Sequence, residues 1–345
     1  MRRHSRLVAA SLLLLGMTLG ACSSSDDADG SAEPSELDAP EGFTVTEVVS
    51  GLSSPTQIAL APDGGLLVAQ LNGGEEDDTG QILLVDPTGD GEPRVLFDGL
   101  RKPTGLAVLG DEVWVQQERS LWRGPLAGGD LEVVLDDLPF NGRSEGTLTT
   151  LVDGRLLYET SGDLLDGQVV AGSGTLWALA PGGTPEVFAT GFKNAYGRTV
   201  DVDGTVWQTE VSDGTFDGAQ PPDELNAIGP GDDAGWPACI GDRLPVIEFG
   251  GTDASCAATV RPKAVFAPRA TPTSVAIAPW DPDVLVVALW NEGRVVTLPR
   301  AGNGAPVEAS TFLTGLARPQ HLLADGDRLL VVDFDAGRIL AVAPV

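Results

Sequence analysis

The chain has 345 residues, of which 42% are hydrophobic, and it contains 44 glycines and 25 prolines. This composition is typical of a turn-rich all-β protein that is long enough to bury a large core. The formal net charge of −29 repels nucleic acid and anionic membrane surfaces, so it excludes nucleic-acid-binding proteins and we expect no such partner.

The amino terminus has the pattern of an export signal. Residues 1–6 are basic, residues 7–19 are apolar and small residues follow, which predicts a signal peptide over residues 1–21, too short to span a bilayer permanently. The run LGAC at 19–22 resembles the lipobox of bacterial lipoproteins, and this resemblance implies that Cys22 is acylated after cleavage. We therefore expect an exported protein that faces the extracytoplasmic side and is held to the cell membrane only through Cys22. An ordinary signal peptide with an incidental cysteine is the alternative.

A linker and one cysteine pair follow. Residues 22–42 are rich in Ser, Asp and Pro, so we expect a lipidated, disordered tether ahead of a folded domain at 43–345. Besides Cys22 the chain contains only Cys239 and Cys256. In an oxidising compartment two cysteines most simply form one disulfide, and a metal site from two thiolates without a nearby His is disfavoured.

The folded part is built from six similar units. Each unit opens with a short strand, at residue 46, 94, 132, 186, 264 or 310, and three further strands follow it. Most of these spacings are typical of four-stranded propeller blades. The sequence stops directly after a closing strand, so the strand at 44–49 would supply the missing outer strand of the last blade. We predict an all-β fold, a six-bladed β-propeller closed by an N-terminal strand in the last blade.

The innermost strand of each blade would line the central channel. The residue directly before each predicted inner strand should then face the channel mouth, where we expect any small ligand to bind. This predicts that five residues point into the mouth: Gln57, Gly105, Gly197, Ser274 and His321.

The fourth unit is the longest. It has a hairpin signal, with strands at 198–202 and 206–209 on either side of Asp203-Gly204. A loop of about two dozen residues follows and is rich in Asp, and loops of this length are usually functional or disordered.

Four segments of this unit resemble the signature blade of the glucose/sorbosone dehydrogenase family: GFKNAYG at 191–197, WQTE at 207–210, DELN at 223–226 and GWP at 235–237. The resemblance is close over 191–237 and loose over the other repeats. It implies a six-bladed propeller that uses pyrroloquinoline quinone (PQQ) and calcium to oxidise sugar aldehydes or lactols. The expected partner is a small sugar-like ligand, and we expect a monomer.

The resemblance also implies cofactor-binding residues. Lys193 and Asn194 match an Arg-Asn pair of the family that contacts the cofactor, although a lysine loses the planar bidentate guanidinium. Asp223 matches an acidic residue near the cofactor. Arg318 partly keeps the basic character with which the last blade begins. Trp236 follows the Asp-rich loop, and we consider it either a packing residue or a wall for a ring-shaped ligand.

The calcium contacts of the family fall near Ser212 and Asp213, and Glu224 lies in the same region. Oxygen-rich loops suit calcium, so these three residues are the candidate metal ligands. A solvated acidic loop is the alternative in a chain with this negative charge.

The general base is where the chain departs from the family. The family's His before the inner strand of the third blade is Arg143 here, and a guanidinium cannot accept a proton at working pH. Asp163 matches the acid that orients this missing His, and His321 is the single histidine after the signal peptide. Asp163 and His321 are thus the candidate catalytic residues, with Glu145 as a third. A capped, structural histidine is the alternative for His321, and Asn291 replaces a cofactor-binding Lys of the family.

Two functions follow from these residues, and a third stays open. The first is a PQQ-dependent sugar dehydrogenase with an altered site. The second is a non-catalytic, surface-tethered propeller that binds a sugar or other small ligand at the same mouth. The third is a scaffold for a protein partner. The sequence has no His-rich metal cluster and no phosphate-binding glycine loop.

Overall fold

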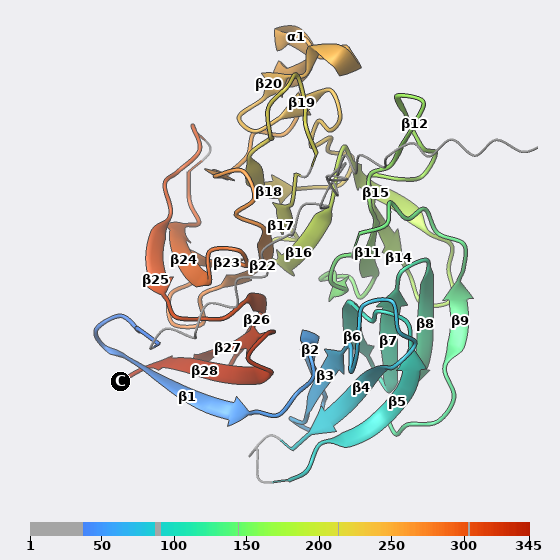
Figure 1. The fold of residues 1–345 in the computed structure, drawn as a ribbon, viewed down its shortest axis with the longest axis vertical. Helices are drawn as coiled ribbons and strands as arrows, with labels where there is room; N and C mark the ends of the chain where they lie inside the picture. The colour runs from blue at the N-terminus through green and yellow to red at the C-terminus, as the bar shows by residue number, and fades with distance from the viewer. Residues whose placement is uncertain (1–36, 87–90, 144, 213, 303) are drawn as a thin grey trace, which may run out of the picture. The chain divides into compact units, whose positions relative to one another are not determined.

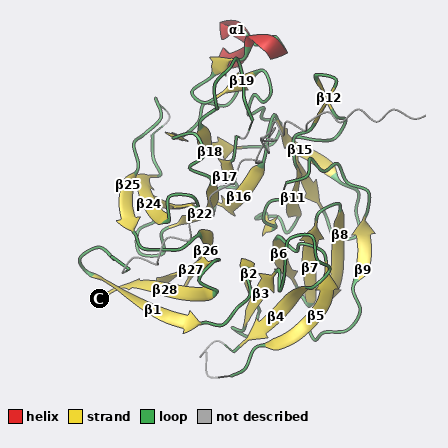
Figure 2. Ribbon diagram, in the orientation of Figure 1, coloured by secondary structure: helices red, strands yellow, loops and turns green. Residues whose placement is uncertain are grey.

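The computed structural model describes residues 37–86, 91–143, 145–212, 214–302 and 304–345. Six four-stranded antiparallel sheets are arranged radially, and almost all regular structure is strand (Figure 1, Figure 2). The inner strands contact one another in the cyclic order β2, β6, β10, β16, β22 and β26, and β26 contacts β2 again. The fold is therefore a six-bladed β-propeller, which confirms the predicted fold class.

Each blade is given from its inner to its outer strand. Blades one to three are β2 (Pro55–Leu60), β3 (Leu66–Gln70), β4 (Gly80–Val85) and β5 (Arg94–Leu100); β6 (Gly105–Leu109), β7 (Glu112–Gln117), β8 (Ser120–Pro125) and β9 (Glu132–Leu135); and β10 (Thr149–Thr150), β11 (Leu156–Thr160), β14 (Thr175–Leu179) and β15 (Glu186–Thr190). Blades four to six are β16 (Ala195–Val200), β17 (Val206–Glu210), β18 (Asp223–Ile228) and β21 (Ala264–Phe266); β22 (Pro272–Ile277), β23 (Val284–Leu289), β24 (Arg294–Pro299) and β25 (Ser310–Leu313); and β26 (Pro319–Asp325), β27 (Arg328–Asp333), β28 (Arg338–Pro344) and β1 (Phe43–Val49).

The N-terminal strand closes the ring, as predicted. Strand β1 pairs antiparallel with β28 and forms the outer edge of blade six (Figure 1). The ring of Phe43 lies 4.8 Å from that of Trp280 and 5.1 Å from that of Phe312, centroid to centroid. Asp38 and Thr314 exchange backbone hydrogen bonds of 3.2 Å, so the last residues of the segment expected as a tether lie against blade five. The predicted signal peptide and Cys22 lie outside the described residues.

Alternating apolar side chains build a hydrophobic cluster at each of the six blade interfaces. Strand β23 shows how this works, because it is buried on both faces. Val286 and Ala288 pack toward blade six, whereas Leu285, Val287 and Leu289 pack toward blade four. Successive side chains of a strand point to opposite faces, so a continuous apolar run serves two interfaces at once.

Two insertions interrupt the regular blades. In blade three, a small ribbon of β12 (Leu164–Leu165) and β13 (Gln168–Val169) lies between β11 and β14. In blade four, the segment between β18 and β21 holds β19 (Cys239–Ile240), β20 (Leu244–Pro245), a 3-10 helix at Ile247–Phe249 and α1 (Asp253–Ala257). The structure contains the Cys239–Cys256 disulfide within this second insertion. Among the described residues, no helix has the length and apolar character needed to cross a membrane.

Replacing both Cys239 and Cys256 by serine is expected to lower the free energy of unfolding by up to about 3 kcal/mol. The bond joins residues 17 positions apart, and opening it restores loop entropy to the unfolded chain. Urea denaturation of the double variant and of the wild type measures the difference. Wild type treated with a reductant should match the double variant, and equal denaturation midpoints for all three samples would contradict the expectation.

Candidate functional site

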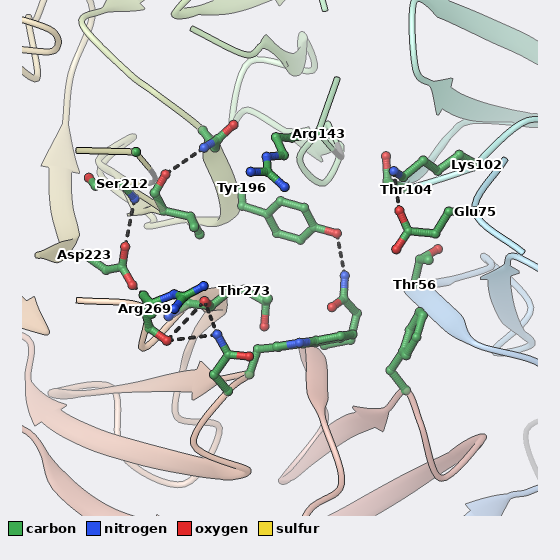
Figure 3. A pocket seen from close by; sticks show the side chains of 18 of the residues that line it. Thr56, Glu75, Lys102, Thr104, Arg143, Tyr196, Ser212, Asp223, Arg269 and Thr273 are labelled. Carbon is green, nitrogen blue, oxygen red and sulfur yellow. Dashed lines mark hydrogen bonds and ion pairs between the residues drawn. The ribbon is translucent and has the colours of Figure 1, made fainter. Parts of the chain in front are cut away.

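A cavity of about 490 Å³ opens at the end of the ring where the inner strands begin and the second strands of the blades end (Figure 3). All six blades contribute to its wall. The residues that line it include Thr56, Glu75, Lys102, Thr104, Arg143, Asn194, Tyr196, Ser212, Asp223, Arg269, Thr271, Thr273, Trp290, Asn291, Gln320 and Phe334.

The cavity is lined by residues one position before those that the sequence predicted. Gln57, Gly105, Gly197, Ser274 and His321 are all buried and none of them lines it. Their predecessors line it instead: Thr56, Thr104, Tyr196, Thr273 and Gln320. In blades one, four, five and six the register shifts at the start of the inner strand. A bulge re-aims the side chains beside it, which is why the prediction was wrong by one residue.

The buried residues hold neighbouring blades together. The amide nitrogen of Gln57 donates to the carbonyl of Leu148 at 2.9 Å, while its oxygen accepts the amide of Leu106 at 2.6 Å, so one side chain ties blades one, two and three together. Gly197 lies so close to blade five that a Cβ atom there would be 2.3 Å from the carbonyl oxygen of Thr273. Only glycine permits this approach of two inner strands.

Three cations and two carboxylates line the cavity in the described part of the chain: Lys102, Arg143 and Arg269 with Glu75 and Asp223. This is a local excess of positive charge in a protein whose net charge is −29. A concave site in which cations outnumber carboxylates attracts anionic ligands. The cavity therefore favours an anionic ligand.

Asp223 lines the cavity as predicted, but its carboxylate also holds the backbone in place. One oxygen accepts the amide of Ser212 at 2.8 Å and the other accepts the amide of Thr271 at 2.8 Å. Asp223 thereby joins the acidic loop of blade four to the start of blade five. Because both oxygens already accept amides, its first role is to shape the cavity wall.

The predicted pair Lys193 and Asn194 is split by the structure. Asn194 lines the cavity, and its side-chain nitrogen donates to the carbonyl of Val211 at 2.8 Å. Lys193 does not line the cavity. Its Nζ donates to the carbonyl of Gly162 at 2.7 Å and lies 5.7 Å from the ring centre of Trp236, so this cation joins blade three to the blade-four insertion.

Arg318 is also outside the cavity lining and supports a residue that belongs to it. It does not line the cavity, and its Nε lies 3.0 Å from a carboxylate oxygen of Asp335. Its guanidinium lies 5.4 Å from the ring centre of Trp290, which does line the cavity, and the Trp290 and Phe334 rings are 4.8 Å apart. Arg318 thus supports an aromatic wall made by Trp290 and Phe334.

None of the three candidate bases lines the cavity. His321 is 5% exposed, and burial lowers its pKa to about 3, so the imidazole is neutral and a poor proton acceptor at neutral pH. Asp163 accepts the amide of Leu164 at 2.8 Å. Glu145 is fully buried and accepts the hydroxyl of Ser161 at 3.1 Å.

The candidate calcium ligands are not brought together as a set. Ser212 lines the cavity, whereas Asp213 lies outside the described residues. Glu224 is buried away from the cavity, where it accepts the side-chain amide of Asn226 at 3.1 Å and the backbone amide of Gly241. Within the residues that the structure describes, no group of three or more His, Cys, Asp or Glu side chains could hold a metal. The described acidic side chains thus do not make up a calcium site.

Two of the cavity cations, Lys102 and Arg269, were not predicted from the sequence. Lys102, Arg269 and Thr271 all have left-handed backbone, with φ of 47°, 66° and 55°. Such backbone is strained for residues other than glycine and is concentrated at functional sites. A sequence signal does exist for two of them, because Lys102 and Thr271 each stand directly before the proline that opens a blade, as does Arg318.

The comparisons agree with this architecture. The family model described as glucose/sorbosone dehydrogenase matches residues 164–341, whereas no curated protein matches the chain. Among solved structures, the PQQ domain of pyranose dehydrogenase from Coprinopsis cinerea has a TM-score of 0.73 and 19% identity, over 91% of this chain and 99% of that one. The calcium structure of a family AA12 carbohydrate-active enzyme from Trichoderma reesei has a TM-score of 0.72 and 18% identity, over 90% and 97%.

A third structure, the PQQ-bound aldose sugar dehydrogenase from Streptomyces coelicolor, has a TM-score of 0.68 and 22% identity, over 89% of this chain and 99% of that one. At these identities the solved structures show that the fold is shared. The family model goes further, because it covers more than half of the chain and spans blades four to six. The chain belongs to the glucose/sorbosone dehydrogenase family.

Proposed function

We propose that the protein is a PQQ-dependent dehydrogenase of an aldose or a related sugar. The observation that carries this proposal is the set of three cations, Lys102, Arg143 and Arg269, around one cavity in an acidic protein. PQQ carries three carboxylates, and guanidinium and ammonium groups form the strongest hydrogen bonds with such ligands. A cavity of about 490 Å³ lies within the range of roughly 300–1,000 Å³ that is usual for cofactor and small-molecule sites.

Different residues of the chain would bind different parts of the ligand. The guanidinium of Arg269 is exposed and has no hydrogen-bond or ion-pair partner in the part of the chain that the structure describes, so it is available to a carboxylate. Its carbonyl oxygen accepts the side-chain amide of Asn291 at 2.9 Å, which fixes the strained backbone. Trp290 and Phe334 offer an apolar wall to the face of a quinone or sugar ring.

Tyr196 serves as a hydrogen-bond donor in this proposal. Burial raises the pKa of Tyr196, so the phenol stays protonated. Its oxygen accepts the side-chain amide of Gln320 at 2.5 Å and keeps its own proton to donate. When bound, PQQ supplies the two-electron oxidant, and the chain supplies orientation, charge and a place for the released proton.

We also propose that the protein works outside the cytoplasm, anchored through Cys22. The signal-like leader and the lipobox-like run at 19–22 support this location. The disulfide between Cys239 and Cys256 is also consistent with an oxidising compartment.

A non-catalytic propeller that binds an anionic small ligand at the same mouth is the second candidate. It is favoured by Arg143, which stands where the family has its basic histidine and lines the cavity as a cation. It is also favoured by the positions of Asp163, Glu145 and His321, none of which lines the cavity.

Titration calorimetry with PQQ, with and without added calcium, tests the proposed function, and dye reduction with a panel of aldoses follows. Arg269→Gln is expected to raise the Kd for PQQ by roughly ten- to a hundredfold, because a charge-assisted hydrogen bond is lost. Arg294→Gln is the matched control, since Arg294 pairs with Glu292 at 2.5 Å and does not line the cavity. Wild type that releases no heat with PQQ would refute the proposed function. Binding of PQQ without dye reduction would support the second candidate, the non-catalytic propeller.

A further inference from the structure

Sugar oxidation needs a proton acceptor in addition to an oxidant. As a lactol or alcohol becomes a carbonyl compound, the C–H hydrogen leaves with its electron pair and the O–H hydrogen leaves as a proton. A quinone can take the hydride, whereas a side chain must take the proton. The sequence-based candidates for this side chain do not line the cavity, so the acceptor has to be found among the residues that do.

Two carboxylates line the cavity in the described part of the chain. Asp223 is fully buried, and its oxygens accept the amides of Ser212 and Thr271. A proton placed on Asp223 would disrupt one of these hydrogen bonds and loosen the wall. Glu75 is therefore the carboxylate that can accept a proton without breaking a backbone hydrogen bond of the cavity wall.

Glu75 is held over the cavity by a buried cation. Its Oε2 lies 2.5 Å from Nζ of Lys102, whose side chain is only 6% exposed. The backbone of Lys102 is left-handed, with φ of 47°, and leads directly into Pro103 at the start of blade two. Figure 3 shows this ion pair beside Thr104, on the side of the cavity opposite Asp223.

The rest of the acidic loop points elsewhere. Glu76, the next residue, does not line the cavity and pairs with Arg101 at 2.9 Å on the surface. The side chain of Glu75 is 60% exposed, and its Oε1 has no partner among the residues that the structure describes. One oxygen of Glu75 is thus fixed by Lys102, whereas the other is available to a ligand and close to solvent.

We propose that Glu75 is the proton acceptor of this reaction and that Lys102 is its positioning residue; the inference rests on the proposed function. The hydroxyl proton of the sugar moves to Oε1 of Glu75 while the C–H hydrogen and its electron pair pass to the quinone. The C–O single bond becomes C=O, the quinone is reduced by two electrons, and Glu75 then releases its proton to water. Lys102 holds the carboxylate toward the cavity during the transfer.

The test compares Glu75→Gln with Glu76→Gln, the same change one residue further along. With saturating PQQ and an aldose that the wild type oxidises, E75Q is expected to lower kcat by roughly 10²- to 10⁴-fold, which is the usual contribution of a general base. The Kd for PQQ, measured by calorimetry, should stay within about twofold for both variants, and E76Q should keep the kcat of the wild type. Glu75→Asp should recover part of the lost rate.

The pH profile separates a proton acceptor from a structural residue. The kcat of the wild type should fall at low pH as a carboxylate becomes protonated, and this limb should be absent from the residual rate of E75Q. At saturating PQQ, Lys102→Met should lower kcat while the melting temperature stays close to that of the wild type. E75Q that binds PQQ and oxidises the aldose as fast as the wild type would overturn this inference alone. Wild type that binds no PQQ, or oxidises no aldose, would overturn the proposed function and this inference with it.

Discussion

Replacement of Arg198 by methionine is expected to lower the free energy of unfolding at pH 8 by about 3–5 kcal/mol. Arg198 lies in β16, the inner strand of blade four, and is only 4% exposed. Its Nε donates to the side chain of Gln208 at 2.8 Å and one Nη donates to the carbonyl of Ala195 at 2.6 Å. The other Nη donates to the carbonyl of Thr147, so the guanidinium joins blade three to blade four.

The size of this effect comes from charge as much as from hydrogen bonds. Glu145 and Glu159 are buried next to Arg198, and burial raises the pKa of both carboxyls while the guanidinium opposes that rise. Methionine fills a similar volume but leaves two buried acids without their cation. Removal of one member of a buried charge group costs more than the group contributes as a whole, because the remaining charge is uncompensated.

Urea denaturation at pH 8 measures this loss, with Arg294→Met as the control. Arg294 is an exposed partner of Glu292, so its loss should cost less than about 1 kcal/mol. The cost of Arg198→Met should shrink at pH 5, where the buried glutamates are protonated, and Glu159→Gln in the same chain should recover part of it. Equal losses of unfolding free energy for Arg198→Met and Arg294→Met would contradict the larger cost expected for the buried charge group.

The fold could be predicted because its signal is repeated six times. Each blade places apolar residues on alternate positions of three or four short strands, and small errors in one unit are corrected by the others. The closing strand followed from counting strands, since blade six lacked an outer partner that only residues near 44–49 could supply. The pairing of β1 with β28 follows from the same need to cover an exposed edge.

The site was predicted only in part, because its residues are placed by irregular backbone. Asn194, Ser212 and Asp223 were found because they lie in the segment that resembles the family, and Arg143 was singled out in the same way. Glu75 stands in a surface loop that carries four consecutive acids, and nothing in the sequence separates it from the other three.

Two of the missed cavity residues depend on backbone that a strand pattern does not report. Lys102 and Arg269 are positioned by left-handed backbone. The bulges that open several blades likewise move the lining by one residue. The alternation of apolar and polar residues along a strand predicts which side chains point to each face of a blade. A bulge adds one residue, so the side chains beyond it point to the opposite face although the composition of the strand is unchanged.

The wild type is expected to become less stable as the pH rises from 5 to 8. Burial raises the pKa of Glu224 from 4.5 to about 7, and it also raises the pKa values of Glu210, Glu145 and Glu159. A carboxyl whose pKa is higher in the folded state stabilises the fold fully below its unfolded value, and this stabilisation is lost as the pH rises through the folded value. His321 has the opposite sign, because its lowered pKa makes the fold more stable as the pH rises toward 6.5, and it offsets one of the four acids.

Glu224→Gln isolates one of these groups and should reverse its effect. Ionisation of Glu224 in the fold costs about 3 kcal/mol, at roughly 1.4 kcal/mol for each unit by which its pKa is raised, so the variant should be more stable than the wild type at pH 8 and similar to it near pH 4.5. Glutamine keeps an oxygen for the amide of Gly241, and its nitrogen can donate to the side-chain oxygen of Asn226, which has no partner in the described part of the structure. Melting temperatures of both proteins between pH 4.5 and 8 give the measurement, with Glu248→Gln as an exposed control in the same insertion. A gap between E224Q and the wild type that does not widen with rising pH would mean that Glu224 remains ionised in the folded protein at low pH, held by the amides around it.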